Sequence, residues 1–363
     1  MIQFHYYNIY IYLLIRAIFA TIRKDLETKN KEIIGNNSII LMFFGESLSI
    51  FLYFIEKAIN KSQKNYFLKY RLEGKIKTSI SSLNVKTKIR IIIIFCGILE
   101  IICSYDFSKK LNYDLIEKEK TLEGLNILLL GIFVYMNEYL YLNTQTYSHQ
   151  QIGFVLVFLS SLIKLFSSIK NNKLFELNLL IYIILIIEKE YLHSMIGIFE
   201  KKLNYEYFVS IYKICGLEGI YGLIFYLCNY FYYNNIKECC SQLMKIFYSP
   251  LSVLTFIISV LIYNLCRLKI AEKTRPSYNT IGYFINNLFL NIFNDSGKKD
   301  IWTVQNIVCT ILSMIGAVIF CEVITLKCYD LDKNTIYETI SRGKIDTCLI
   351  LETSSNENSF SSW

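Results

Sequence analysis

The chain has 363 residues, of which 53% are hydrophobic and 19% are charged, and its formal net charge is +8 at pH 7. Soluble domains average about 25% charged residues, and apolar runs recur along nearly this whole chain, so the composition excludes an ordinary soluble protein and indicates one continuous membrane unit. The basic residues concentrate between the apolar runs, where they indicate orientation in a membrane and not nucleic-acid binding.

Ten apolar runs approach the length that a helix needs to cross a bilayer. Strands of a membrane barrel would alternate apolar and polar residues, and these runs do not, so we expect an all-α membrane protein of ten transmembrane helices. The first run contains Arg16 and lacks a preceding basic region, which favours a helix over a cleaved signal peptide. In chain order, the expected helices cover residues 6–22, 38–55, 89–104, 122–142, 152–169, 177–199, 210–233, 246–266, 278–293 and 301–326.

The loops predict the orientation, because lysine and arginine are retained on the cytoplasmic side of a membrane. The loop between the second and third helices is strongly basic, with Lys57, Lys61, Lys64, Lys69, Arg71, Lys75, Lys77, Lys86, Lys88 and Arg90. We expect this loop to be cytoplasmic. The basic residues Arg267, Lys269, Lys273 and Arg275, read as the loop after the eighth helix, then fall on the same side, together with both termini.

Two similar stretches predict an internal repeat. Glu119–Thr121 and then Asn126 open the fourth helix, and Glu272–Thr274 and then Asn279 open the ninth at the same spacing. We therefore expect five-helix repeats at 1–170 and 171–326, followed by a polar, disordered cytoplasmic tail at 327–363. Since five is an odd number, the two repeats would be inverted relative to each other. Chance recurrence in a Lys- and Asn-rich sequence is the alternative.

Three stretches carry a family resemblance: Met42–Glu46 in the second helix, Glu200–Gly222 at the junction of the sixth and seventh, and Tyr263–Val323 in the last three. With them, the chain resembles the drug/metabolite transporter superfamily, in particular the solute-carrier-35 group, branch F, near the nucleotide-sugar carriers and the chloroquine-resistance-type transporters. The resemblance implies alternating-access transport of a small polar organic solute, which could be a metabolite, nucleotide-sugar-like or drug-like.

The resemblance also implies an endomembrane location, such as Golgi, endosome or lysosome/vacuole, in preference to the plasma membrane. Relatives often carry basic residues in the fourth and ninth helices, where this chain has Glu123, Asn279 and Asn286. An anionic solute therefore does not follow from the resemblance. The alternative function is that of a non-transporting membrane receptor or assembly protein on the same fold.

Isolated carboxylates inside apolar runs are the first candidate solute contacts. Each costs about 2.5 to 3.5 kcal/mol to insert and should face a cavity, a partner or the lipid headgroups. Glu46, Glu123 and Glu218 are the candidates, and a carboxylate buried away from water can also carry a proton. For Glu123, which lies at a helix start, a position at the membrane interface is an equal alternative.

A polar stripe on the ninth helix supplies further candidates. Asn279, Tyr283 and Asn286 recur at helical spacing and should share one face, which suits hydrogen bonding to a neutral solute. Hydrogen bonding between helices is the slightly favoured alternative for this stripe. Asn126, the repeat counterpart of Asn279, completes the set of candidate substrate-binding residues.

The sequence predicts no enzyme, cofactor or metal site. Glu190 and His193 have the spacing of a di-iron ligand pair, but such a site needs a second pair and two more glutamates. The chain contains no nucleophile elbow, Walker loop, dinucleotide-binding glycine pattern or zinc cluster. The expected partners are the lipid bilayer and a small-molecule solute, and a homodimer stays open.

Overall fold

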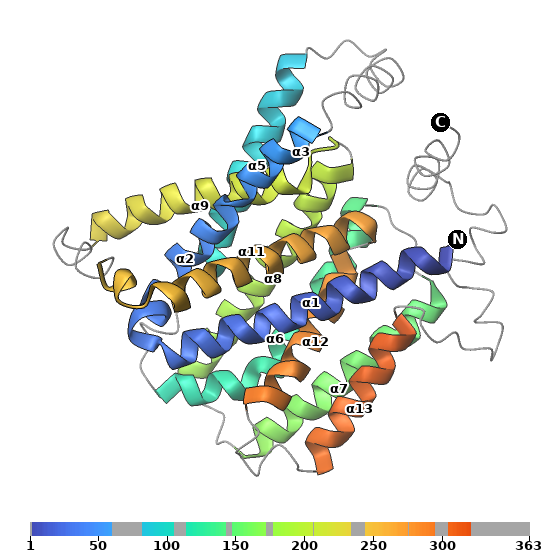
Figure 1. Ribbon diagram of the computed structural model, residues 1–363. Coiled ribbons are helices and arrows are strands. Elements are labelled where there is room, and N and C mark those ends of the chain that lie inside the picture. Colours follow the sequence, from blue (N-terminus) through green and yellow to red (C-terminus); the bar gives the residue numbers. More distant parts are fainter. Residues whose placement is uncertain are drawn as a thin grey trace.

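The computed structural model describes residues 2–59, 82–104, 114–142, 147–171, 177–205, 207–233, 244–274, 276–294 and 304–320. All regular elements in these ranges are helical (Figure 1). They are α1 (Ile2–Lys29), η1 (Lys31–Gly35, a π-helical turn), α2 (Asn36–Ser47), α3 (Ser49–Ile59), α5 (Ser82–Ser104), α6 (Asp114–Leu142), α7 (Ser148–Asn171), α8 (Leu177–Tyr205), α9 (Ile211–Tyr233), η3 (Ile246–Tyr248, a 3-10 turn), α11 (Pro250–Lys273), α12 (Pro276–Asn294) and α13 (Val304–Phe320).

Each of the ten predicted runs corresponds to a helix, and the second run corresponds to α2 and α3 together. The tail at 327–363 and most of the basic loop between the second and third helices lie outside the described residues. One prediction is wrong: Arg267, Lys269 and Lys273 belong to α11 and not to a loop. Hydropathy falls at Arg267, but the helix continues because its backbone hydrogen bonds do not depend on side-chain polarity.

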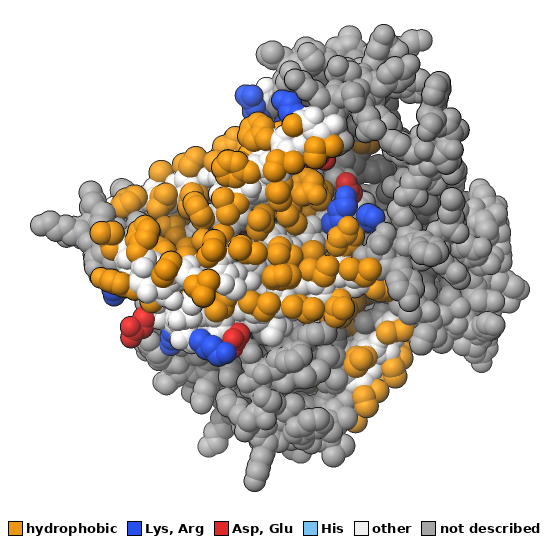
Figure 2. All heavy atoms as spheres, viewed as in Figure 1, with side chains coloured by type: hydrophobic (Ala, Val, Ile, Leu, Met, Phe, Trp, Pro, Cys, Tyr) orange, Lys and Arg blue, Asp and Glu red, His pale blue; other side chains and the backbone are white. Residues whose placement is uncertain are grey.

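One face of the bundle is largely apolar (Figure 2). Asn37–Ile59, Ile211–Phe231 and Pro250–Lys273 are long and apolar enough to cross a membrane, which indicates an integral multi-pass membrane protein. Phe51 and Leu251 are 63% and 76% exposed. Figure 2 shows apolar side chains covering the face formed by α1, α2, α9 and α11, with most of the visible charged side chains near its margins. Such a surface suits contact with lipid.

Helices α2–α3 and α9, the second and seventh of the bundle, lie antiparallel and close together. Glycines on one face of α9 allow this approach, as is common between membrane helices. A Cβ atom on Gly219 would lie 2.7 Å from the Glu46 Cβ atom, closer than packed carbon atoms approach. The contacts run in reverse order along the two helices and pair Gly222 with Phe43, Gly219 with Glu46, and Gly216 with Ile50.

Helices α7 and α13, the fifth and tenth, form another antiparallel pair. A Cβ atom on Gly316 would lie 2.8 Å from the carbonyl oxygen of Gly153, so these backbones meet directly. Further along α7, the hydroxyl oxygens of Ser160 and Ser313 are 2.7 Å apart. Figure 1 shows the two helices side by side.

The direction of α6, the fourth helix, agrees with alternate crossings of a membrane. It lies antiparallel to α12 and parallel to α8, as the fourth helix must relative to the ninth and the sixth. The antiparallel contacts pair Gly131 with Thr280 and Glu138 with Ser277, and the parallel contacts pair Phe133 with Tyr191 and Asn137 with Ser194.

Candidate functional site

One face of α11 carries polar side chains into the interior of the bundle. Tyr263, Asn264 and Arg267 lie within one helical turn of each other on this face. On the opposite side, Leu251 and Leu254 are exposed. Because α11 packs against α1, α2, α8, α9 and α12, its polar face meets side chains from both halves of the chain.

Arg267 forms a two-point ion pair with Glu200 of α8. Its Nη1 donates to Glu200 Oε2 at 3.0 Å, and its Nη2 donates to Glu200 Oε1 at 2.6 Å. A second carboxylate, Glu100 of α5, lies 3.9 Å from the same Nη2. The planar guanidinium matches both oxygens of a carboxylate, which fixes the geometry of this pair. Arg267 therefore connects α5, α8 and α11.

Two further buried carboxylates lie on α2 and α9. Glu46 is 2% exposed, and its Oε1 accepts a hydrogen bond from Asn264 Nδ2 at 2.6 Å. Glu218 is 1% exposed. Within the described part of the chain, Glu46 Oε2 and Glu218 Oε1 are buried without a hydrogen-bond partner. An uncompensated buried polar group costs free energy, so these two positions are candidates for function.

Arg16 of α1 is fully buried and contacts both α11 and α12. Its Nη1 donates to the backbone oxygen of Asn279 at 3.1 Å and to the side-chain oxygen of the same residue at 2.9 Å. Its Nη2 donates to the Tyr263 hydroxyl at 3.1 Å. The guanidinium carbon also lies 4.4 Å from the ring centroid of Tyr283, a cation–π distance. The arginine thus holds three helices together.

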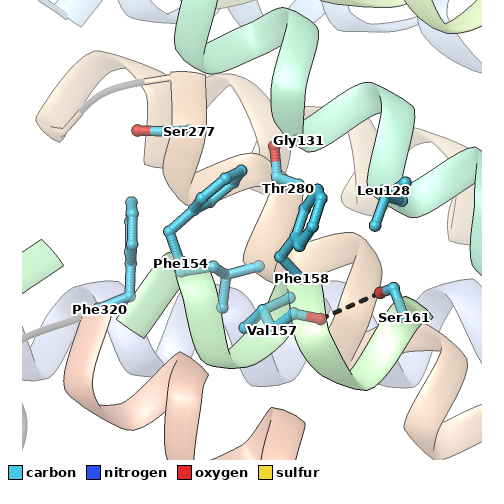
Figure 3. A pocket seen from close by; sticks show the side chains of 10 residues that line it. Leu128, Gly131, Phe154, Val157, Phe158, Ser161, Ser277, Thr280 and Phe320 are labelled. Atoms are coloured by element: carbon cyan, nitrogen blue, oxygen red, sulfur yellow. Dashed lines mark hydrogen bonds between the residues drawn. The ribbon is translucent and has the colours of Figure 1, made fainter. Parts of the chain in front are cut away.

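A small pocket lies between α6, α7, α12 and α13 (Figure 3). The rings of Phe154, Phe158 and Phe320 surround it, and its polar groups come from Ser161, Ser277 and Thr280. The cavity measures about 20 Å³, which is room for one water molecule and not for an organic solute. The interface of α6 and α12 is therefore closed at the position of this pocket.

Helices α6 and α12 carry polar atoms that are unpaired in the described part of the chain, and Thr280, which has one of them, lines this pocket. The Oδ1 atoms of Asn126 and Asn286 and the Oγ1 atom of Thr280 are buried, and no described residue makes a hydrogen bond to them. The fourth and ninth helices thus present acceptors, and one hydroxyl, that a bound molecule could satisfy.

The six sequence-predicted site residues whose side chains the structure describes do not form one cluster. Glu46 and Glu218 lie near the polar face of α11, whereas Asn126 and Asn286 belong to α6 and α12. The Glu123 side chain lies outside the described residues. On the ninth helix, Asn279 and Tyr283 contact Arg16, which is the interhelical bonding considered as the alternative.

The sequence patterns do not predict the residues at the centre of the site. The family resemblance includes Glu200 without a role, hydropathy places Arg267 in a loop, and no pattern indicates Glu100. The signal in the sequence is the charge itself, since Glu100 lies within one expected helix and Glu200 and Arg267 directly follow two others. Charges retained there need partners of opposite sign.

The chain was also compared with known proteins. No family model and no curated protein matches it. The geometry of the site and the sequence patterns are therefore the basis for a functional proposal.

Proposed function

We propose that this protein is a secondary transporter of the drug/metabolite type, similar in pattern to the solute-carrier-35 group. It moves a small polar organic solute across an endomembrane by alternating access. The observation that carries the proposal is the equivalent packing of helices in the two halves of the chain.

Exchanging the halves replaces α1 by α8, α2 by α9, α5 by α11, α6 by α12 and α7 by α13. The contact of α1 with α11 then becomes that of α8 with α5, and the contact of α1 with α12 becomes that of α8 with α6. The contact of α2 with α11 likewise becomes that of α9 with α5. All of these contacts are present, which supports two related five-helix units.

Some contacts join a helix to its own counterpart in the other half. These are the pairs α2–α9, α6–α12 and α7–α13, and in each pair the two helices run in opposite directions. This arrangement supports an inversion between the units. Two inverted units can exchange their conformations, so that a site between them opens first to one side of the membrane and then to the other.

The unpaired atoms on α6 and α12 support a solute path between these helices. Asn126, Thr280 and Asn286 offer hydrogen-bonding groups without a formal charge. A neutral polar or weakly charged solute would satisfy them when the interface opens. The phenylalanine rings of the neighbouring pocket would contact its apolar part.

One observation favours the second candidate, a non-transporting membrane receptor or assembly protein. The cavity of about 20 Å³ is too small for an organic solute. A bundle that stays closed would not transport a solute. A transporter must therefore reach a second conformation in which α6 and α12 separate.

Reconstitution into liposomes tests the proposal. We expect at least one labelled solute from a panel of sugars, nucleosides, amino acids and amines to exchange across the membrane faster than in protein-free liposomes. Asn286→Ala should slow this exchange at unchanged protein content, because it removes a buried acceptor of the proposed path.

The control is Glu32→Ala, an exposed residue of η1, which packs against α1, α2 and η3. It should leave exchange unchanged. If no solute exchanges while a known carrier works in the same liposomes, the transport proposal fails and the receptor or assembly role gains support.

A further inference from the structure

We propose that Glu46 of α2 and Glu218 of α9 form a proton-binding site, occupied while the two helices are in contact and vacated when they separate. Each carboxylate takes up one proton to become a neutral carboxylic acid, and water accepts that proton on release. The binding of protons rests on the buried charges alone, whereas their role as the coupling ion rests on the proposed transport function.

Four glutamates are buried in this part of the bundle. Glu46, Glu100, Glu200 and Glu218 are at least nine-tenths buried, and they come from α2, α5, α8 and α9. The other charged or titratable groups that interact with these four carboxylates are Arg16 and Arg23 of α1, Cys96 of α5, His193 of α8, Cys215 of α9 and Arg267 of α11, and Lys201 is the neighbour of Glu200 on α8.

Most of the cations in this set are engaged elsewhere. Arg267 is held on both oxygens of Glu200. Lys201 binds three backbone carbonyls at the end of α11, and Arg23 lies over the ring of Tyr263. Glu46 and Glu218 are therefore left without an ion-pair partner among the described residues.

Glu46 Oε2 and Glu218 Oε1 are buried and have no hydrogen-bond donor in the described part of the chain. A lone ionised carboxylate in such a place is costly, and the usual outcome is that it becomes neutral. In the same part of the chain, no three His, Cys, Asp or Glu side chains converge on a metal position. A proton is the cation that fits.

The two carboxylates lie where α2 and α9 pack closely together. Gly219, the residue after Glu218, brings the α9 backbone against the side chain of Glu46. On the other side of α9, Gly97 of α5 packs against the backbone oxygen of Glu218. In the proposed repeat, α2 and α9 are counterparts in the two halves, so a change of conformation between the halves would separate them. Their separation would admit water to both carboxylates, and hydration favours release of the protons.

Infrared spectroscopy of the purified protein in detergent at neutral pH tests the site directly. A protonated carboxylic acid has a C=O stretching band that a carboxylate lacks. We expect Glu46→Gln and Glu218→Gln each to lower the area of this band, and the double variant to lose both contributions. Glu56→Gln, which removes a half-buried carboxylate that accepts from Ser210 at 2.6 Å, should leave the band unchanged.

Glutamine has the shape of protonated glutamate, so these variants should keep the unfolding temperature of the wild type. If Glu46→Gln does not fold, Glu46→Asp provides a second test, because it should keep the band and shift its frequency. An unchanged band in both glutamine variants would overturn the proposal. The measurement needs no solute, so a protein that fails to transport would still show the band.

Discussion

Arg267 of α11 binds Glu200 of α8 through both carboxylate oxygens, at 3.0 and 2.6 Å, inside the bundle. Glu100 of α5 lies 3.9 Å from the same guanidinium, so one arginine faces carboxylates from both halves of the chain. A buried pair of this kind is costly to break, because removal of one partner leaves the other charge without compensation.

Removal of Arg267 alone should therefore be more damaging than removal of the pair. We expect Arg267→Met to lower the free energy of unfolding by about 3 to 5 kcal/mol, the range for an orphaned buried charge. The double variant Arg267→Met/Glu200→Met should recover part of this loss, since two apolar side chains replace the pair. Thermal unfolding in detergent, followed by circular dichroism, measures both variants.

The same double-mutant cycle can also contradict this prediction. If the effects of Arg267→Met and Glu200→Met simply add, the two side chains are energetically independent, and the pair does not organise the site. Lys29→Met is a suitable control, because Lys29 pairs with Asp25 at 2.8 Å on the exposed end of α1. Exposed pairs of this type contribute little to stability.

Two glycine-to-alanine variants should have opposite effects. A Cβ atom on Gly219 would lie 2.7 Å from the Glu46 Cβ atom, so Gly219→Ala should force α2 and α9 apart and destabilise the protein by about 1 to 3 kcal/mol. Among the described residues, a Cβ atom on Gly197 of α8 would meet only Pro276, at 3.8 Å. Gly197→Ala should therefore stabilise by up to about 1 kcal/mol, since alanine is the better helix former.

Unfolding temperatures of both alanine variants in the same detergent decide this prediction. Equal destabilisation by the two substitutions would show that the packing of α2 on α9 is looser than described. A stabilising Gly219→Ala would contradict the close contact outright.

The helices could be predicted from the sequence because each contributes its own apolar surface to the lipid. The ends of the helices could not be predicted, because local hydropathy falls at a charged residue even when a residue far away in sequence compensates its charge. Hydropathy places the end of the eighth helix before Arg267, yet α11 continues to Lys273, and the partner of Arg267 is Glu200, which lies far from it in sequence.

The candidate site was predictable only where one residue stood out alone. Glu46 and Glu218 are single carboxylates in apolar runs, and both are buried in the structure. The pairing of Arg16 with Asn279 joins residues 263 positions apart, and no local pattern in one sequence contains that information. The residue spacing on the ninth helix predicts one shared face, but only the structure shows that Arg16 contacts Asn279 and Tyr283 on it.

The contacts between helix ends predict which loops share a side of the membrane. The turns η1 and η3 contact each other, so Lys31 and Lys245 should lie on one side. The alternating helix directions put Lys57 and Lys273 on the other, which the basic loops predict to be cytoplasmic. Cysteine placed at each position and labelled with a membrane-impermeant thiol reagent, from either side of sealed vesicles, tests the arrangement.

Wild-type protein gives the background from native cysteines in that experiment. Lys57→Cys and Lys273→Cys should react from one side only, and Lys31→Cys and Lys245→Cys from the other. Labelling of Lys31→Cys and Lys57→Cys from the same side would contradict a single membrane crossing by α2 and α3, and with it the inverted repeat.

Lys201 of α8 fixes the end of α11, and its loss should loosen the junction of α11 and α12. Its Nζ atom donates to the backbone oxygens of Ala271 and Thr274 at 2.8 Å and of Glu272 at 3.1 Å. These are the carbonyl groups that a helix end leaves without partners, and a cation there is also favoured by the helix dipole.

We expect Lys201→Met to cost about 1.5 to 3 kcal/mol, the range for hydrogen bonds to a charged group. Lys202→Met, at the half-buried neighbouring position, is the matched control and should cost less. Thermal unfolding gives the stability, and hydrogen–deuterium exchange gives the location of the change. Faster exchange confined to the end of α11 is the expected result, because those amides lose their fixed helix terminus. Equal exchange in both variants would show that Lys201 does not hold the junction.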